Sequence, residues 1–237
     1  RAIKAAEAKI GPKGKRPHTT RRIYRELSAM ARRSPGYAPV KKHTALVKRF
    51  SNQLAKALQA KHVMLDRGLV NQGAIAHDSM RDLKEHDSKT QILLAKKGAP
   101  AVSRVIGSGE SWTMLNHKSF SLEKKLVIYG DYICRGVKVG NTFMNGVLPS
   151  KTAFRLLVSQ RQASPERVDN LVRERQVVMR FEADLRAVGI DPNDLIREHM
   201  KRNPKTFLDW VQQVMDPNFE KAVKASMKRL GTKKLDY

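Results

Sequence analysis

The sequence is short of cysteine and has no long apolar run. Cys134 is the only cysteine among 237 residues, which excludes an intramolecular disulfide and a cysteine-rich zinc site. No stretch approaches the ~20 consecutive apolar residues that a membrane-spanning helix needs. Hydrophobic residues nevertheless make up 41% of the chain, so it can bury a core. We therefore expect a folded protein with no disulfide and no membrane partner, in which Cys134 is a buried, unreactive residue.

Acidic residues are nearly absent from the first quarter of the chain. Residues 1–62 hold 17 lysines and arginines but only two acids, Glu7 and Glu26, and carry +15 of the total net charge of +25. A solvated helix usually mixes lysine with glutamate, because opposite charges four residues apart stabilise it. Like charges one turn apart repel, and a polyanion removes that repulsion and releases its own counterions. The missing acids indicate a polyanionic partner; the alternative is a soluble helix with an incidentally basic face.

Two amphipathic helices are predicted in this basic part of the chain, at 20–33 and 42–67. The apolar side chains of the second helix recur at helical spacing and share one stripe: Val47, Phe50, Leu54, Leu58 and Leu65. On its opposite side, Lys42, Arg49 and Lys56 are spaced by sevens and so stack in one line. This pattern predicts one face that packs on the protein and another that contacts phosphate.

The predicted phosphate contacts are cations of the N-terminal arm and of these two helices. They are Lys13, Lys15, Arg16, Arg21, Arg22, Arg25, Arg32, Arg33, Lys41, Lys42, Lys48, Arg49 and Lys56. Lysine and arginine position a protein on phosphate without reading base edges, which favours folded RNA recognised by its shape and backbone. We therefore expect RNA as the partner, with DNA as the alternative ligand of the same face.

The chain is predicted to be mainly α and to have four segments. These are a basic arm at 1–18, a basic helical region at 19–99, a glycine-rich β or loop segment at 100–148 and a C-terminal array of short helices at 149–237. In the second segment, a further helix at 70–97 is expected to form an antiparallel hairpin with the helix at 42–67. In the third, β-rich runs predict a small sheet or extended loops: Val102–Ile106, Leu126–Tyr129, Tyr132–Val139 and Thr142–Val147.

In the C-terminal segment, a proline directly follows a helix-capping residue at four positions. Such pairs occur at Ser164-Pro165, Asp191-Pro192, Asn203-Pro204 and Asp216-Pro217. A side-chain oxygen that caps the first turn, followed by a proline with a preset φ, favours helix initiation. We expect a helix at 151–162 and then one from each of these prolines. Their core is expected to contain Phe207, Leu208, Trp210, Val211 and Val214.

No sequence motif predicts catalysis. The chain lacks a phosphate-binding loop, a dinucleotide fingerprint, a His-Glu-x-x-His motif and a Cys-x-x-Cys motif. Two doublets, His77-Asp78 and His86-Asp87, are similar to those of metal phosphohydrolases. They lie nine residues apart on a predicted helix, so they cannot face one metal without help, and a polar helix surface explains them. We therefore expect no catalytic residue, metal, cofactor or small-molecule substrate.

The layout of the chain resembles that of many mitochondrial ribosomal proteins: a basic N-terminal arm, a basic helical hairpin and a separate helical body. The resemblance implies a non-enzymatic subunit that binds ribosomal RNA through its basic helices and neighbouring ribosomal proteins through its C-terminal helices, in the mitochondrial matrix. An acid-poor, arginine-rich start is also typical of a transit peptide. Three alternatives stay open: a DNA-binding or nucleoid protein, an RNA-processing or ribosome-assembly factor, and a subunit with acidic protein partners.

Overall fold

The computed structural model describes residues 37–78, 86–96, 98–106, 120–161 and 164–237. In these ranges ten helices and one two-stranded antiparallel sheet make up the structure, which confirms the predicted mainly α fold class. The predicted arm and the predicted helix at 20–33 lie outside the described residues. No helix within the described ranges is both long and apolar enough to cross a membrane.

The central helix is α3 (Tyr37–Ala60), which packs on α4, α8, both strands and α11. Its predicted apolar stripe is confirmed, because Val47, Phe50 and Leu54 are fully buried. The helix ends at Ala60, seven residues before the predicted Arg67. The reason is a left-handed residue that stops the helix: His62 has a φ of 61°, and the amide groups that follow the last turn bond back to its carbonyls.

The single helix predicted at 70–97 is wrong, because the structure has two helices there, α4 (Arg67–Ala76) and α5 (His86–Lys96). Asp66 begins α4 by accepting a hydrogen bond from the Leu69 amide at 3.0 Å. This helix packs closely on α3, as expected for the first half of the predicted hairpin.

The glycine-rich segment is partly helical. The β predictions at 102–106 and 126–129 are wrong, because residues 102–105 belong to α6 (Pro100–Val105), which ends just before Ile106, and residues 126–129 belong to α8 (Leu122–Ile133). Leu126 to Gly130 are all buried in succession, so α8 has no apolar periodicity that the sequence could display. The remaining prediction is confirmed: β1 (Cys134–Val139) pairs with β2 (Thr142–Val147) across a tight turn at Gly140, whose φ is +57°.

Five helices form the C-terminal part: α9 (Ser150–Arg161), α10 (Pro165–Ala187), α11 (Pro192–Met200), α12 (Phe207–Val214) and α13 (Phe219–Arg229). The cap at Asp191 is confirmed, because its carboxylate accepts a hydrogen bond from the Asn193 amide. Asn203 is not a cap. Its side chain instead forms two hydrogen bonds with the backbone of Val147 in β2, and α12 begins three residues after Pro204.

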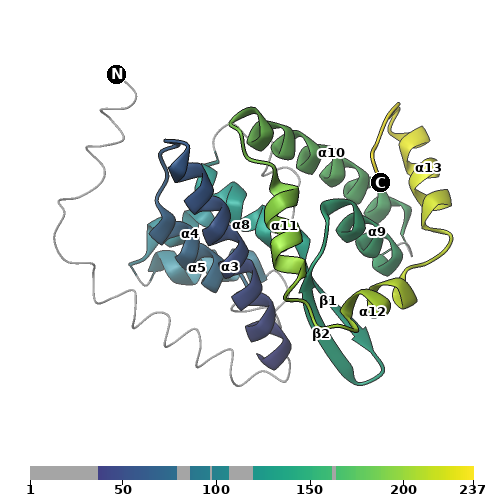
Figure 1. Cartoon of the computed structure of the whole chain (residues 1–237), viewed down its shortest axis with the longest axis horizontal. Helices are drawn as coiled ribbons and strands as arrows, with labels where there is room; N and C mark the ends of the chain where they lie inside the picture. The colour runs from purple at the N-terminus through teal and green to yellow at the C-terminus, as the bar shows by residue number, and fades with distance from the viewer. Residues whose placement is uncertain (1–36, 79–85, 97, 107–119, 162–163) are drawn as a thin grey trace.

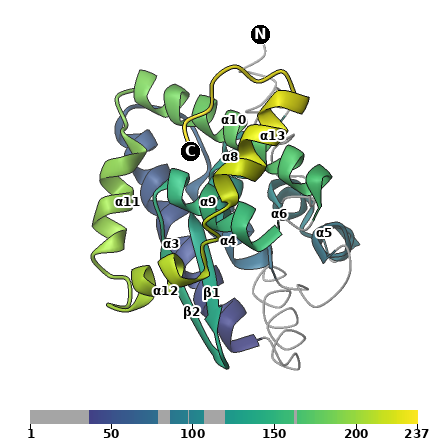
Figure 2. The same ribbon diagram turned by 90° about the vertical axis from the view of Figure 1, so that its right-hand side faces the viewer.

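A continuous core joins α3, α4, α8, the hairpin and α9 to α13, and a smaller cluster lies between α4, α5 and α6. Phe207 and Val211 belong to the main core as predicted, whereas Leu208 is 39% exposed. Figure 1 shows α3 and α4 on one side of the molecule and α9 and α13 on the other, with the hairpin extending below. Figure 2 shows the same hairpin beside α3 and α12 from a second direction.

Candidate metal centre

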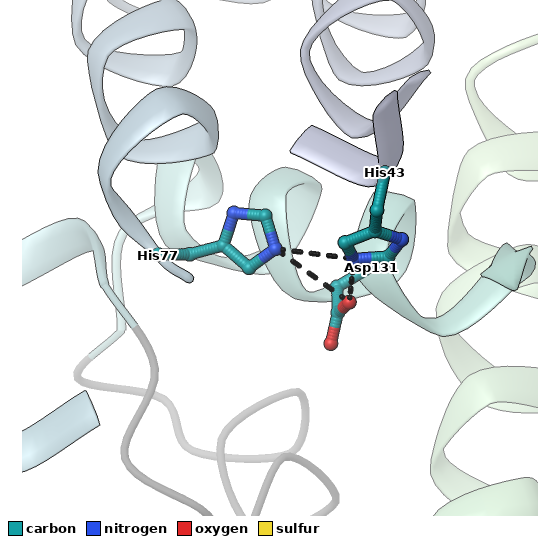
Figure 3. Close-up of side chains that lie close together, drawn as sticks. All are labelled: His43, His77 and Asp131. Carbon is teal, nitrogen blue, oxygen red and sulfur yellow. Dashed lines mark hydrogen bonds and ion pairs between the residues drawn. The ribbon is translucent and has the colours of Figure 1, made fainter. Parts of the chain in front are cut away.

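Three helices bring two histidines and two aspartates together. His43 lies in the second turn of α3, His77 follows the last residue of α4, and Asp131 lies in the last turn of α8 (Figure 3). Asp78 comes directly after His77 in the chain. The close approach of α3 and α8 depends on Gly130, where a Cβ atom would lie only 2.2 Å from the Ser51 hydroxyl. A small residue directly before Asp131 therefore sets the position of its carboxylate beside His43.

The side-chain atoms that could bind a metal converge on one point. Asp131 Oδ1 lies 2.9 Å from His43 Nε2 and 3.6 Å from His77 Nε2, and the two Nε2 atoms are 3.4 Å apart. Asp78 Oδ2 lies 3.5 Å from His43 Nε2 and 3.8 Å from His77 Nε2. His43, His77 and Asp131 are the only potential metal-binding group of three such residues in the described ranges.

The tautomer of His77 is fixed by the backbone. Its Nδ1 lies 2.8 Å from the carbonyl oxygen of Ala74, which can only accept a hydrogen bond, so Nδ1 carries a proton. In the neutral ring, Nε2 then presents a lone pair to the carboxylates of Asp78 and Asp131, which also present lone pairs. Such an arrangement needs a positive charge at its centre, from a second proton on His77 or from a metal ion. Metal-binding histidines usually hold their outer nitrogen in this way.

The opposite charges in the cluster shift the pKa values of His77 and Asp131. Burial lowers the pKa of His77, but the charge of Asp78 and the hydrogen bond and charge of Asp131 outweigh burial and raise it to about 9. Desolvation likewise opposes ionisation of Asp131, but hydrogen bonds from both histidines hold the pKa of this carboxyl well below its usual value. In the absence of metal, His77 is therefore a cation at neutral pH.

The spacing of the cluster fits a small divalent ion. Ligands about 2.1 Å from a metal are separated by about 3.0 to 3.4 Å at right-angled to tetrahedral geometry, close to the three distances among His43, His77 and Asp131. Mixed imidazole and carboxylate ligands suit zinc, manganese, iron, cobalt or nickel rather than calcium. The histidine side chains are 5% and 8% exposed and that of Asp131 is 37% exposed, so the cluster meets solvent on the Asp131 side.

Comparison of the chain with protein family models, curated proteins and solved structures finds no match.

Of the two predicted doublets, the structure places His77-Asp78 in the cluster, whereas the side chains of His86 and Asp87 lie outside those described. Sequence reasoning missed His43 and Asp131. Two signals could have found them. His43 lies one turn before Val47 and so extends the buried stripe of α3 with a polar residue, and Asp131 is a carboxylate within an otherwise apolar run.

Eight of the thirteen predicted phosphate contacts, from Lys13 to Arg33, lie outside the described residues. The other five are on α3. Four of them are exposed, Lys41, Lys42, Arg49 and Lys56, and Lys48 is half-buried. No acidic residue occurs in α3, so within this helix these cations form an uncompensated strip. This strip and the histidine cluster use different faces of one helix.

Proposed function

We propose that the protein is a divalent-metal-dependent phosphohydrolase whose metal is held by His43, His77 and Asp131, with Asp78 beside them. One observation carries the proposal: two imidazole nitrogens and a carboxylate oxygen converge within 3.6 Å of one another, with the His77 tautomer fixed by the Ala74 carbonyl. A bound transition metal polarises a phosphoryl oxygen and makes water a stronger acid. Asp78 Oδ2 lies 3.5 Å from His43 Nε2 and 3.8 Å from His77 Nε2, so Asp78 would be the carboxylate to accept a proton from a water molecule held at the metal.

A phosphate ester is the substrate class that fits the charge. The net charge of +25 attracts anions to the molecule as a whole. A thiol mechanism does not fit, because Cys134 is fully buried, where desolvation raises the pKa of its thiol and disfavours the thiolate. With a divalent ion held by His43, His77 and Asp131, the site would support attack by water on an anionic phosphoryl group.

Metal analysis and hydrolysis assays test this proposal together. The chain, without a histidine tag, is stripped with a chelator, reloaded with manganese, cobalt, nickel or zinc, and assayed with p-nitrophenyl phosphate and bis(p-nitrophenyl) phosphate. We expect one bound ion per chain and hydrolysis of at least one ester, both lost in His77→Ala and Asp131→Ala. His199→Gln is the matched control, because this buried histidine also packs on α3, against Phe50 and Gln53. Unchanged metal content in His77→Ala contradicts the proposal.

The second candidate function is the one expected from composition: an RNA-binding structural subunit of a large ribonucleoprotein such as a mitochondrial ribosome. The uncompensated strip of exposed cations on α3 supports it. Binding to folded RNA through phosphate is expected to weaken steeply with salt. Sedimentation of the native protein with ribosomal particles tests this candidate, and its absence from those particles rejects it.

A further inference from the structure

A groove lies between α3, β2 and the segment that follows α11. Its volume is about 520 Å³, and its lining includes Lys42, Leu46, Arg49, Phe143, Met144 and Arg202. We propose that this groove binds single-stranded nucleic acid, with phosphates on the three cations and a base on the Phe143 ring. The inference goes beyond hydrolysis and does not depend on the metal centre, since Lys42 and Arg49 face the groove whereas His43 faces α4 and α8.

Two of the three cations of the groove are spaced along α3. Lys42 and Arg49 are seven residues apart on α3, or about 10 Å at 1.5 Å per residue. In the described part of the chain, neither of them forms an ion pair. Arg202 pairs with Glu198 at 3.2 Å, but both side chains are about half exposed. Because such surface pairs contribute little, a phosphate can replace Glu198 as the partner of Arg202.

The ring of Phe143 is held in place by the hairpin. A Cβ atom at Gly136, on the neighbouring strand, would lie 2.2 Å from the Phe143 ring, so the ring lies directly against this glycine. The same ring is half-buried and lines the groove. An aromatic ring fixed on one side and accessible on another is suited to stacking on a base.

The combination of charge and apolar surface identifies the ligand class. Besides the cations, the groove is lined by apolar side chains, Leu46, Met144 and Pro204 among them. Free inorganic phosphate would leave this apolar surface unused, and duplex nucleic acid hides its base faces. Single strands present both a regular backbone charge and exposed base faces, which is the pairing that basic grooves with aromatic rings recognise.

Fluorescence anisotropy of the full chain measures the binding. The probes are labelled oligo(U) and oligo(dT) of about 16 nucleotides and a duplex of the same length, over a range of salt concentrations. We expect either single strand to bind more tightly than the duplex, and the tighter of the two identifies RNA or DNA as the natural class. Equal or tighter binding of the duplex overturns the proposal.

Variants separate the two kinds of contact. Lys42→Gln combined with Arg49→Gln is expected to lower affinity at least tenfold and to reduce the slope of log affinity against log salt by about 1.4. Phe143→Leu is expected to lower affinity about tenfold with an unchanged slope, and Phe143→Tyr to retain it. The matched control is Arg180→Gln with Lys221→Gln, which removes the same charge from exposed positions on α10 and α13.

Two results would show that nucleic acid does not bind in this groove. An equal loss in the control pair, or full affinity in Phe143→Leu, overturns the groove as the binding site. His77→Ala is expected to bind the oligonucleotides as the unmodified chain does, so failure of the metal proposal and failure of the groove proposal are seen in different measurements. Melting curves of each variant confirm that the chain is folded.

Discussion

At the scale of single residues, His77 links protonation to stability. Its pKa is about 9 in the folded, metal-free protein against an ordinary 6.5, so its contribution is fully present below pH 6.5 and is lost as the pH rises through 9. The free energy of unfolding is therefore expected to fall between pH 6.5 and 9.5, by at most about 3 kcal/mol. Urea unfolding at these two pH values measures it, and His77→Gln should remove most of the difference.

The same residue predicts how metal affinity depends on pH. A metal must displace the proton from His77 Nε2, so affinity is expected to rise about tenfold per pH unit below pH 9 and to level off above it. Asp131 does not add to this slope, because its pKa is held well below its usual value and it is ionised throughout. Calorimetric titration with one divalent ion at several pH values is the measurement. An affinity that is independent of pH below 9 rules out His77 as a ligand.

At the scale of elements, the contact between α3 and α8 sets the geometry of the proposed metal centre. Gly130→Ala places a methyl group against the Ser51 hydroxyl, so we expect a loss of about 1–3 kcal/mol of stability and weaker metal binding as Asp131 moves from His43. Ser51→Ala removes that hydroxyl, although it also removes a hydrogen bond to the Leu126 carbonyl. The double variant should therefore recover metal affinity that Gly130→Ala loses. Absence of recovery contradicts the proposed steric cause.

Helices whose apolar residues recur at helical spacing could be predicted from the sequence. A helix that is buried on all sides, and contacts between residues far apart in the chain, could not. The stripe Val47, Phe50 and Leu54 identifies α3 because one side of that helix faces solvent. In α8, burial on all sides removes the period, so a strand was predicted in its place. Asn203 has the chemistry of a cap, but its hydrogen bonds go to Val147, 56 residues away in the chain. The residues of the candidate metal centre are likewise brought together only by the fold, because only His77 and Asp78 are neighbours in sequence.

At the scale of the whole molecule, Arg175 joins α10 to α9 and to the C-terminal residues. Its guanidinium is 2% exposed and donates hydrogen bonds to the Ser150 hydroxyl and the Asp236 carbonyl, and it lies 3.9 Å from Glu182. Glu182 is also buried and accepts a hydrogen bond from Tyr129.

Arg175→Leu removes the hydrogen bonds to Ser150 and Asp236 and one of the two cations beside the buried Glu182, which keeps Arg186 at 3.8 Å, so we expect a loss of about 1–3 kcal/mol of stability. Arg180→Leu, at an exposed position on the same helix, is expected to change it by less than about 0.5 kcal/mol. Chemical unfolding of both variants measures the two values. Similar losses in the two variants would show that the buried network does not hold these elements together.

The most direct test of the account is the absorption spectrum of the untagged protein titrated with cobalt(II). Binding by His43, His77 and Asp131 predicts ligand-field bands that saturate at one equivalent, disappear in His77→Gln and Asp131→Asn, and persist in His199→Gln. A spectrum that stays that of the hydrated ion, or one that His77→Gln leaves unchanged, contradicts the proposed metal centre.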